Sequence, residues 1–116
     1  MSQLALLVDG VVSQFFNLES GKITIGRSPD SDICIDDASV STNHAVITVT
    51  QNEFLEDHVD VFIEDLKSRN GTLVNDEPIQ WCRLKPEDVV SIGWNKFKLL
   101  DDHTVGKETT VLMMLD

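Results

Sequence analysis

The run AVITVT at residues 45–50 indicates a β-strand, because β-branched side chains in this alternation fit the pleated surface of a half-buried strand. A similar run, KITIG, occupies residues 22–26. Turn residues border both runs and recur along the chain, at Asp9-Gly10, Ser20-Gly21, Ser28-Pro29-Asp30, Asn70-Gly71, Asn75-Asp76 and Trp94-Asn95. No window shows a sustained helical period of about 3.6 residues, and no internal repeat is evident. The pattern therefore predicts short strands joined by turns.

Together with these two runs, the candidate strands lie at residues 4–8, 11–16, 22–26, 32–35, 45–50, 59–64, 72–74, 79–83, 88–92 and 96–100. Short strands separated by turns at intervals of about 8–12 residues are typical of a β-sandwich or a barrel. We expect an all-β fold, a two-sheet β-sandwich of about ten or eleven short, mainly antiparallel strands. The sandwich is expected to span residues 1–101, and residues 102–116 are expected to form a tail or a final docked element.

Composition narrows the class of protein. The 116-residue chain is 41% hydrophobic, enough for one packed core, and its net charge is −11. This acidic balance argues against broad nucleic-acid binding and against an acidic membrane surface as partner. With neither a signal peptide nor a bilayer-spanning apolar stretch, we expect a cytoplasmic protein. Cys34 and Cys82 fit no disulfide framework or zinc pattern, and His58 and His103 lack ligand-like neighbours, so we expect reduced thiols, no metal and no cofactor.

Three turn-like segments carry residues suited to binding an anion. They are GRS at residues 26–28, SVSTNHA at residues 39–45 and DLKSRNGTLVN at residues 65–75. Arg27, Lys67 and Arg69 lie in these segments, and an acidic protein can still bind an anion where its few cations converge. Loops held by the end of a rigid sandwich are common places for binding residues. The three segments are therefore the candidate site.

Together the segments resemble a forkhead-associated (FHA) domain, which has Gly-Arg after a strand, then Ser-x-x-His-Ala, then Asn-Gly-Thr followed by Val-Asn. All three motifs occur here in that order, and the resemblance covers roughly residues 4–100. It implies a phosphothreonine-dependent protein-binding module that acts downstream of a Ser/Thr kinase and is not an enzyme. Its partner would be a protein or peptide that contains phosphothreonine, a group with about −1.5 to −2 charges and three acceptor oxygens.

The resemblance also implies roles for individual residues. Arg27 and Ser41 match the residues that contact the phosphate, through a planar guanidinium and a short hydroxyl. Thr42 stands where the family usually has Arg or Asn, and it can offer a hydroxyl or its backbone N–H. Arg69 can add a second cation, and Asn70 matches the asparagine that holds the main chain of the ligand. Four residues are expected to support the site structurally: Gly26, His44, Gly71 and Asn75.

Two other functions stay open at this point. The chain could be a phosphate-independent scaffold that binds partners through a sheet face or through the apolar end at residues 111–115. It could also be a hydrolase that uses Ser41 and His44, although no Gly-x-Ser-x-Gly elbow or orienting acid is evident.

Three further expectations concern single residues. Gly26 is expected to supply an unusual backbone angle at the end of a strand. Trp81 and Trp94 are expected to pack and not to recognise a ligand. Thr109 and Thr110 suggest the hypothesis that a phosphorylated tail binds its own pocket or a neighbouring copy of the chain.

Overall fold

The computed structural model describes residues 2–19, 21–52, 54 and 59–101, and the regular elements in these ranges are strands. There are eleven: β1 (Ser2–Val8), β2 (Val11–Leu18), β3 (Gly21–Gly26), β4 (Ile33–Cys34), β5 (Ala45–Gln51), β6 (Val59–Asp65), β7 (Thr72–Val74), β8 (Glu77–Ile79), β9 (Trp81–Leu84), β10 (Val89–Ile92) and β11 (Asn95–Asp101). They form a six-stranded and a five-stranded sheet, so the predicted all-β, two-sheet sandwich is confirmed. Across the described ranges, no helix is long and apolar enough to span a membrane.

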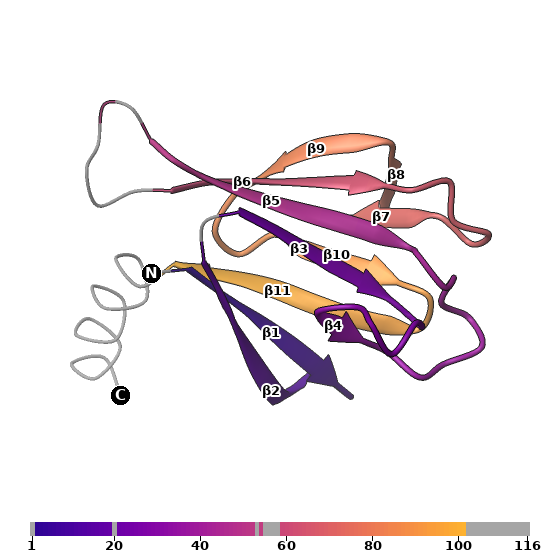
Figure 1. Cartoon of the computed structure of the whole chain (residues 1–116). Helices are drawn as coiled ribbons and strands as arrows, with labels where there is room; N and C mark the ends of the chain where they lie inside the picture. The colour runs from indigo at the N-terminus through magenta and orange to yellow at the C-terminus, as the bar shows by residue number, and fades with distance from the viewer. Residues whose placement is uncertain (1, 20, 53, 55–58, 102–116) are drawn as a thin grey trace.

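The two sheets lie face to face (Figure 1). The six-stranded sheet has the order β2-β1-β11-β10-β7-β8, and the five-stranded sheet has the order β4-β3-β5-β6-β9. Among the described strands, β3 and β4 form the one parallel pair, and the other registered pairs are antiparallel. The expectation of mainly antiparallel pairing is therefore confirmed.

Alternate side chains of the strands fill the space between the sheets. In β5, Ala45, Ile47 and Val49 are buried, whereas Val46 and Thr48 are partly exposed. This alternation follows from the two-residue period of a strand, and it is the pattern that the run at residues 45–50 indicated. The core cluster takes residues from both sheets: Leu4, Leu18, Ile25, Ile33, Val40, Ala45, Ile47, Val49, Val61, Ile63, Val74, Leu84, Val90, Ile92, Phe97 and Leu99.

The structure departs from the predicted strands around residues 79–83. That single predicted strand is divided between β8, which ends at Ile79, and β9, which begins at Trp81. Pro78 lies in β8, although a proline cannot donate to the hydrogen-bond ladder. It is tolerated because β8 is the edge strand of its sheet and pairs with β7 alone. The predicted tail at residues 102–116, with Thr109 and Thr110, lies outside the described residues, as do His58 and His103.

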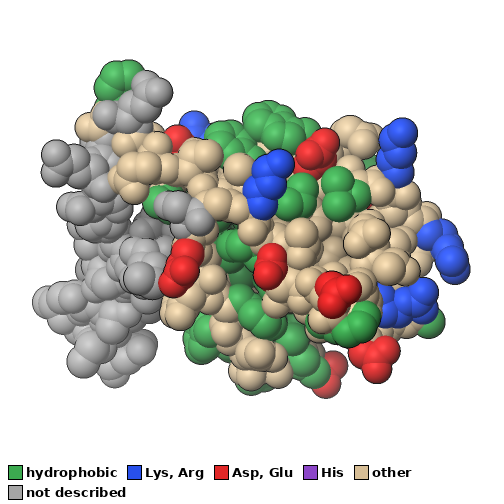
Figure 2. Space-filling model, in the orientation of Figure 1, with side chains coloured by type: hydrophobic (Ala, Val, Ile, Leu, Met, Phe, Trp, Pro, Cys, Tyr) green, Lys and Arg blue, Asp and Glu red, His purple; other side chains and the backbone are tan. Residues whose placement is uncertain are grey.

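The loops that contain the three segments meet at one end of the sandwich. Ala45 pairs with Ile25 and with Asp65, so β3 ends, β5 begins and β6 ends side by side. In the other sheet Thr72 pairs with Ile92, which sets the start of β7 level with the end of β10. Figure 1 shows these loops at the right-hand end of the view, and Figure 2 shows Lys and Arg side chains gathered at that end. The fold therefore concentrates positive charge where the candidate segments lie.

Candidate functional site

A small pocket opens at this end of the sandwich, and we call it the Arg27 pocket. It has a volume of about 190 Å³, and three loops line it, those between β3 and β4, between β4 and β5, and between β6 and β7. All five residues that were predicted to bind a phosphopeptide line it: Arg27, Ser41, Thr42, Arg69 and Asn70. The remaining lining residues are Ala38, Ser39 and Val40. Residues that are distant in sequence thus surround a single hollow.

Main-chain hydrogen bonds hold Arg27 beside the second segment. The N–H of Arg27 donates to the carbonyl of Ser41 at 3.0 Å, and the N–H of Ser28 donates to the carbonyl of Thr42 at 3.2 Å. The side chain of Arg27 is exposed, and within the described part of the chain its guanidinium has no ion-pair partner. An anchored backbone with an uncommitted guanidinium can present planar donors to an anion without first breaking a salt bridge.

The close contact between the end of β3 and the second segment requires a glycine at position 26. The expectation that Gly26 has an unusual backbone angle is wrong. Its φ lies outside the left-handed region that favours glycine. A β-carbon at this position would instead lie 2.1 Å from the carbonyl oxygen of Thr42 and 3.1 Å from Oγ of Ser31. The nearer atom belongs to the backbone, so it cannot swing aside as a side chain could. Any other residue at position 26 would push the second segment away from β3.

Ser41 connects the second segment to the third. Its Oγ accepts a hydrogen bond from the backbone N–H of Arg69 at 2.9 Å. Because the oxygen acts as acceptor here, the hydroxyl hydrogen is left to donate to a ligand in the pocket. The Arg69 side chain is exposed and, like that of Arg27, has no ion-pair partner among the residues that the structure describes. Two guanidinium groups and one hydroxyl donor are thus available at the same pocket.

His44 is fully buried, and its ring bonds to both the second and the third segment. The backbone N–H of Ser41 donates to Nδ1 at 3.0 Å, so Nδ1 carries no hydrogen. Nε2 lies 2.8 Å from the carbonyl oxygen of Gly71 and therefore donates to it. The neutral ring links two loops through their backbones. Since Nδ1 bonds the backbone of Ser41 and not its hydroxyl, the pair is not arranged for the nucleophilic catalysis that a hydrolase needs.

Asn70 also lines the pocket, and its side chain is exposed. Its Nδ2 donates to the carbonyl of Ser39 at 2.8 Å, which is a second bond between the loops. The side-chain oxygen and the other amide hydrogen have no partner among the described residues. They can therefore pair with the C=O and N–H of an extended peptide. Gly71 follows with a φ of 80°, a left-handed conformation that suits glycine, and its carbonyl faces His44.

Asp65 supports the third loop, a role that the sequence motifs did not indicate. Its carboxylate accepts hydrogen bonds from the N–H of Ser68 at 3.1 Å and from the hydroxyl of Thr72 at 2.8 Å. Burial acts to raise the pKa of Asp65, but the hydrogen bonds from Ser68 and Thr72 outweigh it and lower the pKa below its ordinary value of 3.8. An Asp placed three residues before a Ser at the end of a strand is a turn pattern that could have indicated this role.

Asn75 lies away from the pocket, at the other end of β7. Its Nδ2 donates to Asp88 at 3.0 Å, and its Oδ1 accepts the N–H of Val89 at 3.0 Å. With a φ of 52°, it shapes the turn between β7 and β8 and attaches that turn to the start of β10. Of the four residues expected to support the site, Gly26, His44 and Gly71 contact its loops directly, and Asn75 does not.

The two tryptophans lie in different surroundings. Trp81 stacks on Phe62, with ring centroids 5.2 Å apart, although it remains 60% exposed. The packing expected of Trp94 is wrong, because its side chain is 87% exposed. Cys34 and Cys82 are free thiols. Within the described ranges, no group of three His, Cys, Asp or Glu side chains is placed to hold a metal ion.

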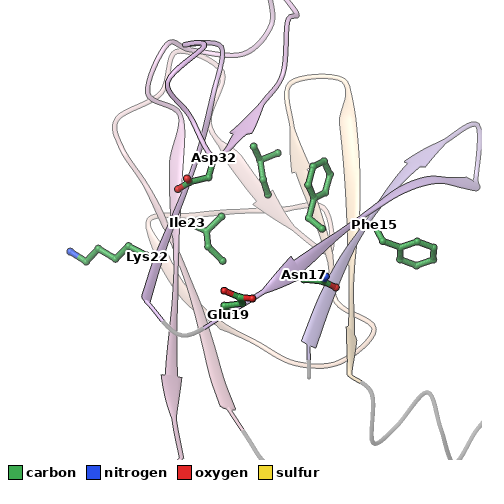
Figure 3. Close-up of a pocket in the computed structure, with 8 residues that line it drawn as sticks. Phe15, Asn17, Glu19, Lys22, Ile23 and Asp32 are labelled. Atoms are coloured by element: carbon green, nitrogen blue, oxygen red, sulfur yellow. The ribbon is translucent and has the colours of Figure 1, made fainter.

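A larger groove, of about 450 Å³, lies elsewhere, where β2 faces β3 and the start of β4. Figure 3 shows Lys22, Ile23 and Asp32 on one side of it, with Asn17 and Glu19 on the other. Its lining contains one cation, Lys22, against two carboxylates, and none of the residues that the sequence motifs predicted. The Arg27 pocket, where two arginines meet, is therefore the candidate site.

Comparison with known proteins agrees with this geometry. The family model of the FHA domain matches residues 23–93, a stretch that includes every loop around the Arg27 pocket. The chain belongs to the FHA domain family.

Relatives of this FHA domain extend the match. The glycogen accumulation regulator GarA of Mycobacterium tuberculosis is 41% identical over 85 residues, which cover 73% of this chain and 47% of GarA. The chain therefore spans about half the length of that relative. The FHA domain of CT664 from Chlamydia trachomatis has a TM-score of 0.76 at 32% identity and covers 86% of this chain and 96% of its own. A structure solved to study phosphothreonine-dependent FHA domain interactions has a TM-score of 0.70 at 27% identity. The match covers 85% of this chain and 96% of that one.

Proposed function

We propose that this FHA domain is a phosphothreonine-dependent protein-binding module that recruits proteins phosphorylated by a Ser/Thr kinase. The observation that carries the proposal is the convergence of Arg27, Ser41 and Arg69 on one pocket. Two uncommitted guanidinium groups and an available hydroxyl hydrogen suit a dianion with three acceptor oxygens. The chain as a whole carries a net charge of −11, so it can attract an anion only where its cations converge in this way.

The remaining lining residues support a phosphorylated threonine within a peptide as the ligand. Ala38 lines the pocket and is exposed, so it offers apolar surface against which the methyl group of threonine can pack. A phosphoserine would leave that surface uncovered. Asn70 offers both an acceptor and a donor beside the pocket, which suits a peptide main chain more than a free phosphate ion.

A regulatory role without catalysis fits these features. The relative GarA is named a regulator, and the match to this chain covers 47% of its length. His44 is committed to two backbone groups and is therefore assigned no catalytic role. The phosphothreonine must be made by a Ser/Thr kinase, which therefore acts before this domain in the same pathway.

A second candidate function is phosphate-independent binding through a sheet face. Apolar side chains at the β1–β2 hairpin favour it, because Val8 is 53% exposed, Val11 is 68% exposed and Phe15 is 54% exposed. β2 is also an edge strand, and exposed apolar edges can pair with other chains. The two candidates differ in the surface that a partner would cover, the loops around Arg27 or the hairpin.

Calorimetric titration separates the two candidates. The probes are phosphothreonine peptides, the same peptides with phosphoserine and the same peptides without phosphate. We expect binding to depend on the phosphate and Arg27→Ala to weaken it at least 30-fold, because removing one partner of a charged pair costs about 2 kcal/mol or more. Lys85→Ala is the matched control, since it removes an exposed cation beyond Leu84, at the opposite end of the sandwich.

Two results would contradict the proposal. One is equal affinity for phosphorylated and unphosphorylated peptides. The other is an Arg27→Ala variant that binds phosphopeptide as tightly as Lys85→Ala does.

A further inference from the structure

Four of the described strands, β2, β8, β4 and β9, lie at the edges of the two sheets, and β2 differs from the other three. β4 has two residues, and β8 has three, one of which is Pro78. β9 has four residues and carries Arg83, which forms an ion pair with Asp60. Short length, proline and charge all discourage an edge from pairing with another chain. β2 runs over the eight residues Val11–Leu18, which include neither a charge nor a proline, so this edge lacks those protections.

The backbone of β2 is paired on one side. β2 pairs with β1, and in the described part of the chain no strand lies on its other side. In an antiparallel pair, every second residue directs both its N–H and its C=O away from the partner strand. The register skips Ser13, which marks a bulge, but residues 14–18 pair in regular order with residues 2–6. Residues 14–18 therefore present a regular row of free hydrogen-bonding groups.

Exposed apolar side chains accompany this edge. Phe15 is 54% exposed, and Figure 3 shows it pointing away from Ile23 of the facing sheet. Nearer the hairpin turn, Val11 is 68% exposed and Val12 is 43% exposed. Covering such side chains removes apolar surface from water. The edge thus combines free backbone groups with apolar surface, and these are the two features that support the addition of a strand from another chain.

Charge indicates which chain can cover this edge. Each copy of the domain carries a net charge of −11, so two copies repel each other except where acidic side chains are absent. Residues 10–18 contain no charged side chain, and pairing this stretch with itself places no like charges opposite one another. A basic partner would gain no attraction from an uncharged strand. A two-fold dimer uses the same patch on both copies, and this strand is complementary to itself.

We propose that the domain forms a two-fold dimer in which residues 14–18 of β2 pair antiparallel with the same residues of a second copy. The six-stranded sheets of the two copies then become continuous. Antiparallel pairing turns the second copy end for end. Because the Arg27 pocket lies at one end of the sandwich (Figure 1), the two pockets face away from each other and each stays open. The dimer is therefore independent of the proposed function.

Salt separates this contact from the binding of a phosphate. Added salt screens the repulsion between two chains of net charge −11, so dimerisation should strengthen as the salt concentration rises from about 50 mM to about 500 mM. Phosphopeptide binding should weaken over the same range, because it depends on attraction between opposite charges.

The test is sedimentation velocity of the whole chain from micromolar to millimolar protein. A reducing agent prevents Cys34 and Cys82 from linking two copies. Phe15→Lys should raise the dissociation constant of the dimer at least about tenfold, because each dimer contains position 15 twice and a lysine opposes edge pairing. Gln14→Lys should weaken the dimer too, and it replaces an exposed polar residue, so the fold is retained. Trp81→Lys is the matched control, since Trp81 is 60% exposed on an edge strand of the other sheet.

Amide hydrogen exchange locates the contact. As the protein concentration rises, exchange should slow for alternate amides within residues 14–18 and stay unchanged around Arg27. A chain that stays monomeric throughout, a dimer that both Phe15→Lys and Gln14→Lys leave intact, or protection centred elsewhere would overturn this inference alone. Arg27→Ala should leave the dimer intact, so the proposed function is judged by a separate measurement, the binding of phosphopeptide.

Discussion

Replacing His44 is the sharpest test of how the site is assembled. The ring is fully buried and has two bonds, 3.0 Å from the N–H of Ser41 to Nδ1 and 2.8 Å from Nε2 to the carbonyl of Gly71. His44→Ala removes both ring nitrogens, so the N–H of Ser41 and the carbonyl of Gly71 lose their hydrogen bonds. Each unpaired group costs about 1–3 kcal/mol, and water can reach the half-buried Ser41 and Gly71 in part. We therefore expect a total loss of about 2–4 kcal/mol in the free energy of unfolding.

Two conservative variants divide that loss. His44→Asn places a carbonyl oxygen near the position of Nδ1 and can accept from Ser41, whereas His44→Gln places an N–H near Nε2 and can donate to Gly71. Each should recover about half of the stability that His44→Ala loses. The assay is equilibrium unfolding in urea, with affinity for a phosphothreonine peptide measured on the same samples. The reasoning is refuted if His44→Ala lies within about 0.5 kcal/mol of the unsubstituted domain, or if neither conservative variant improves on it.

Two other substitutions test the supports of the loops. Gly26→Ala would place a β-carbon 2.1 Å from the carbonyl oxygen of Thr42. Urea unfolding should therefore show a loss of about 1–3 kcal/mol in the free energy of unfolding, together with weaker phosphopeptide binding. Unchanged stability and binding would show that the two backbones are not in tight contact there. Asp65 has a lowered pKa in the folded state, so its contribution to stability is present above pH 3.8 and is lost as the pH falls below that value. Unfolding measured from pH 7 to pH 3 should therefore show Asp65→Asn less stable than the parent at neutral pH, with the gap closing in acid; a gap that widens in acid would refute the assignment.

The strands could be predicted wherever burial leaves a period of two in the sequence. The run at residues 45–50 buries every second side chain, and that pattern is visible without coordinates. β8 could not be found in this way, because it has three residues and one of them is Pro78. Its existence depends on the free edge of β7, which is a property of the sheet and not of the segment.

The sequence predicted that the five binding candidates would lie together, but not how the loops around them are held. The motifs indicated which side chains belong together, and all five binding candidates line the Arg27 pocket. They could not show that Oγ of Ser41 accepts from the backbone of Arg69, because that bond depends on how β5 and β6 are registered. The close approach at Gly26 and the exposure of Trp94 likewise depend on neighbours from other loops.

The most direct measurement is a backbone amide NMR titration of this domain with one phosphothreonine peptide and with its unphosphorylated counterpart. The account predicts that the phosphorylated peptide alone causes the largest shifts at Arg27, Ser41, Thr42, Arg69 and Asn70, the residues around a single pocket. Shifts centred on the β1–β2 hairpin, or the same shifts with both peptides, would contradict it.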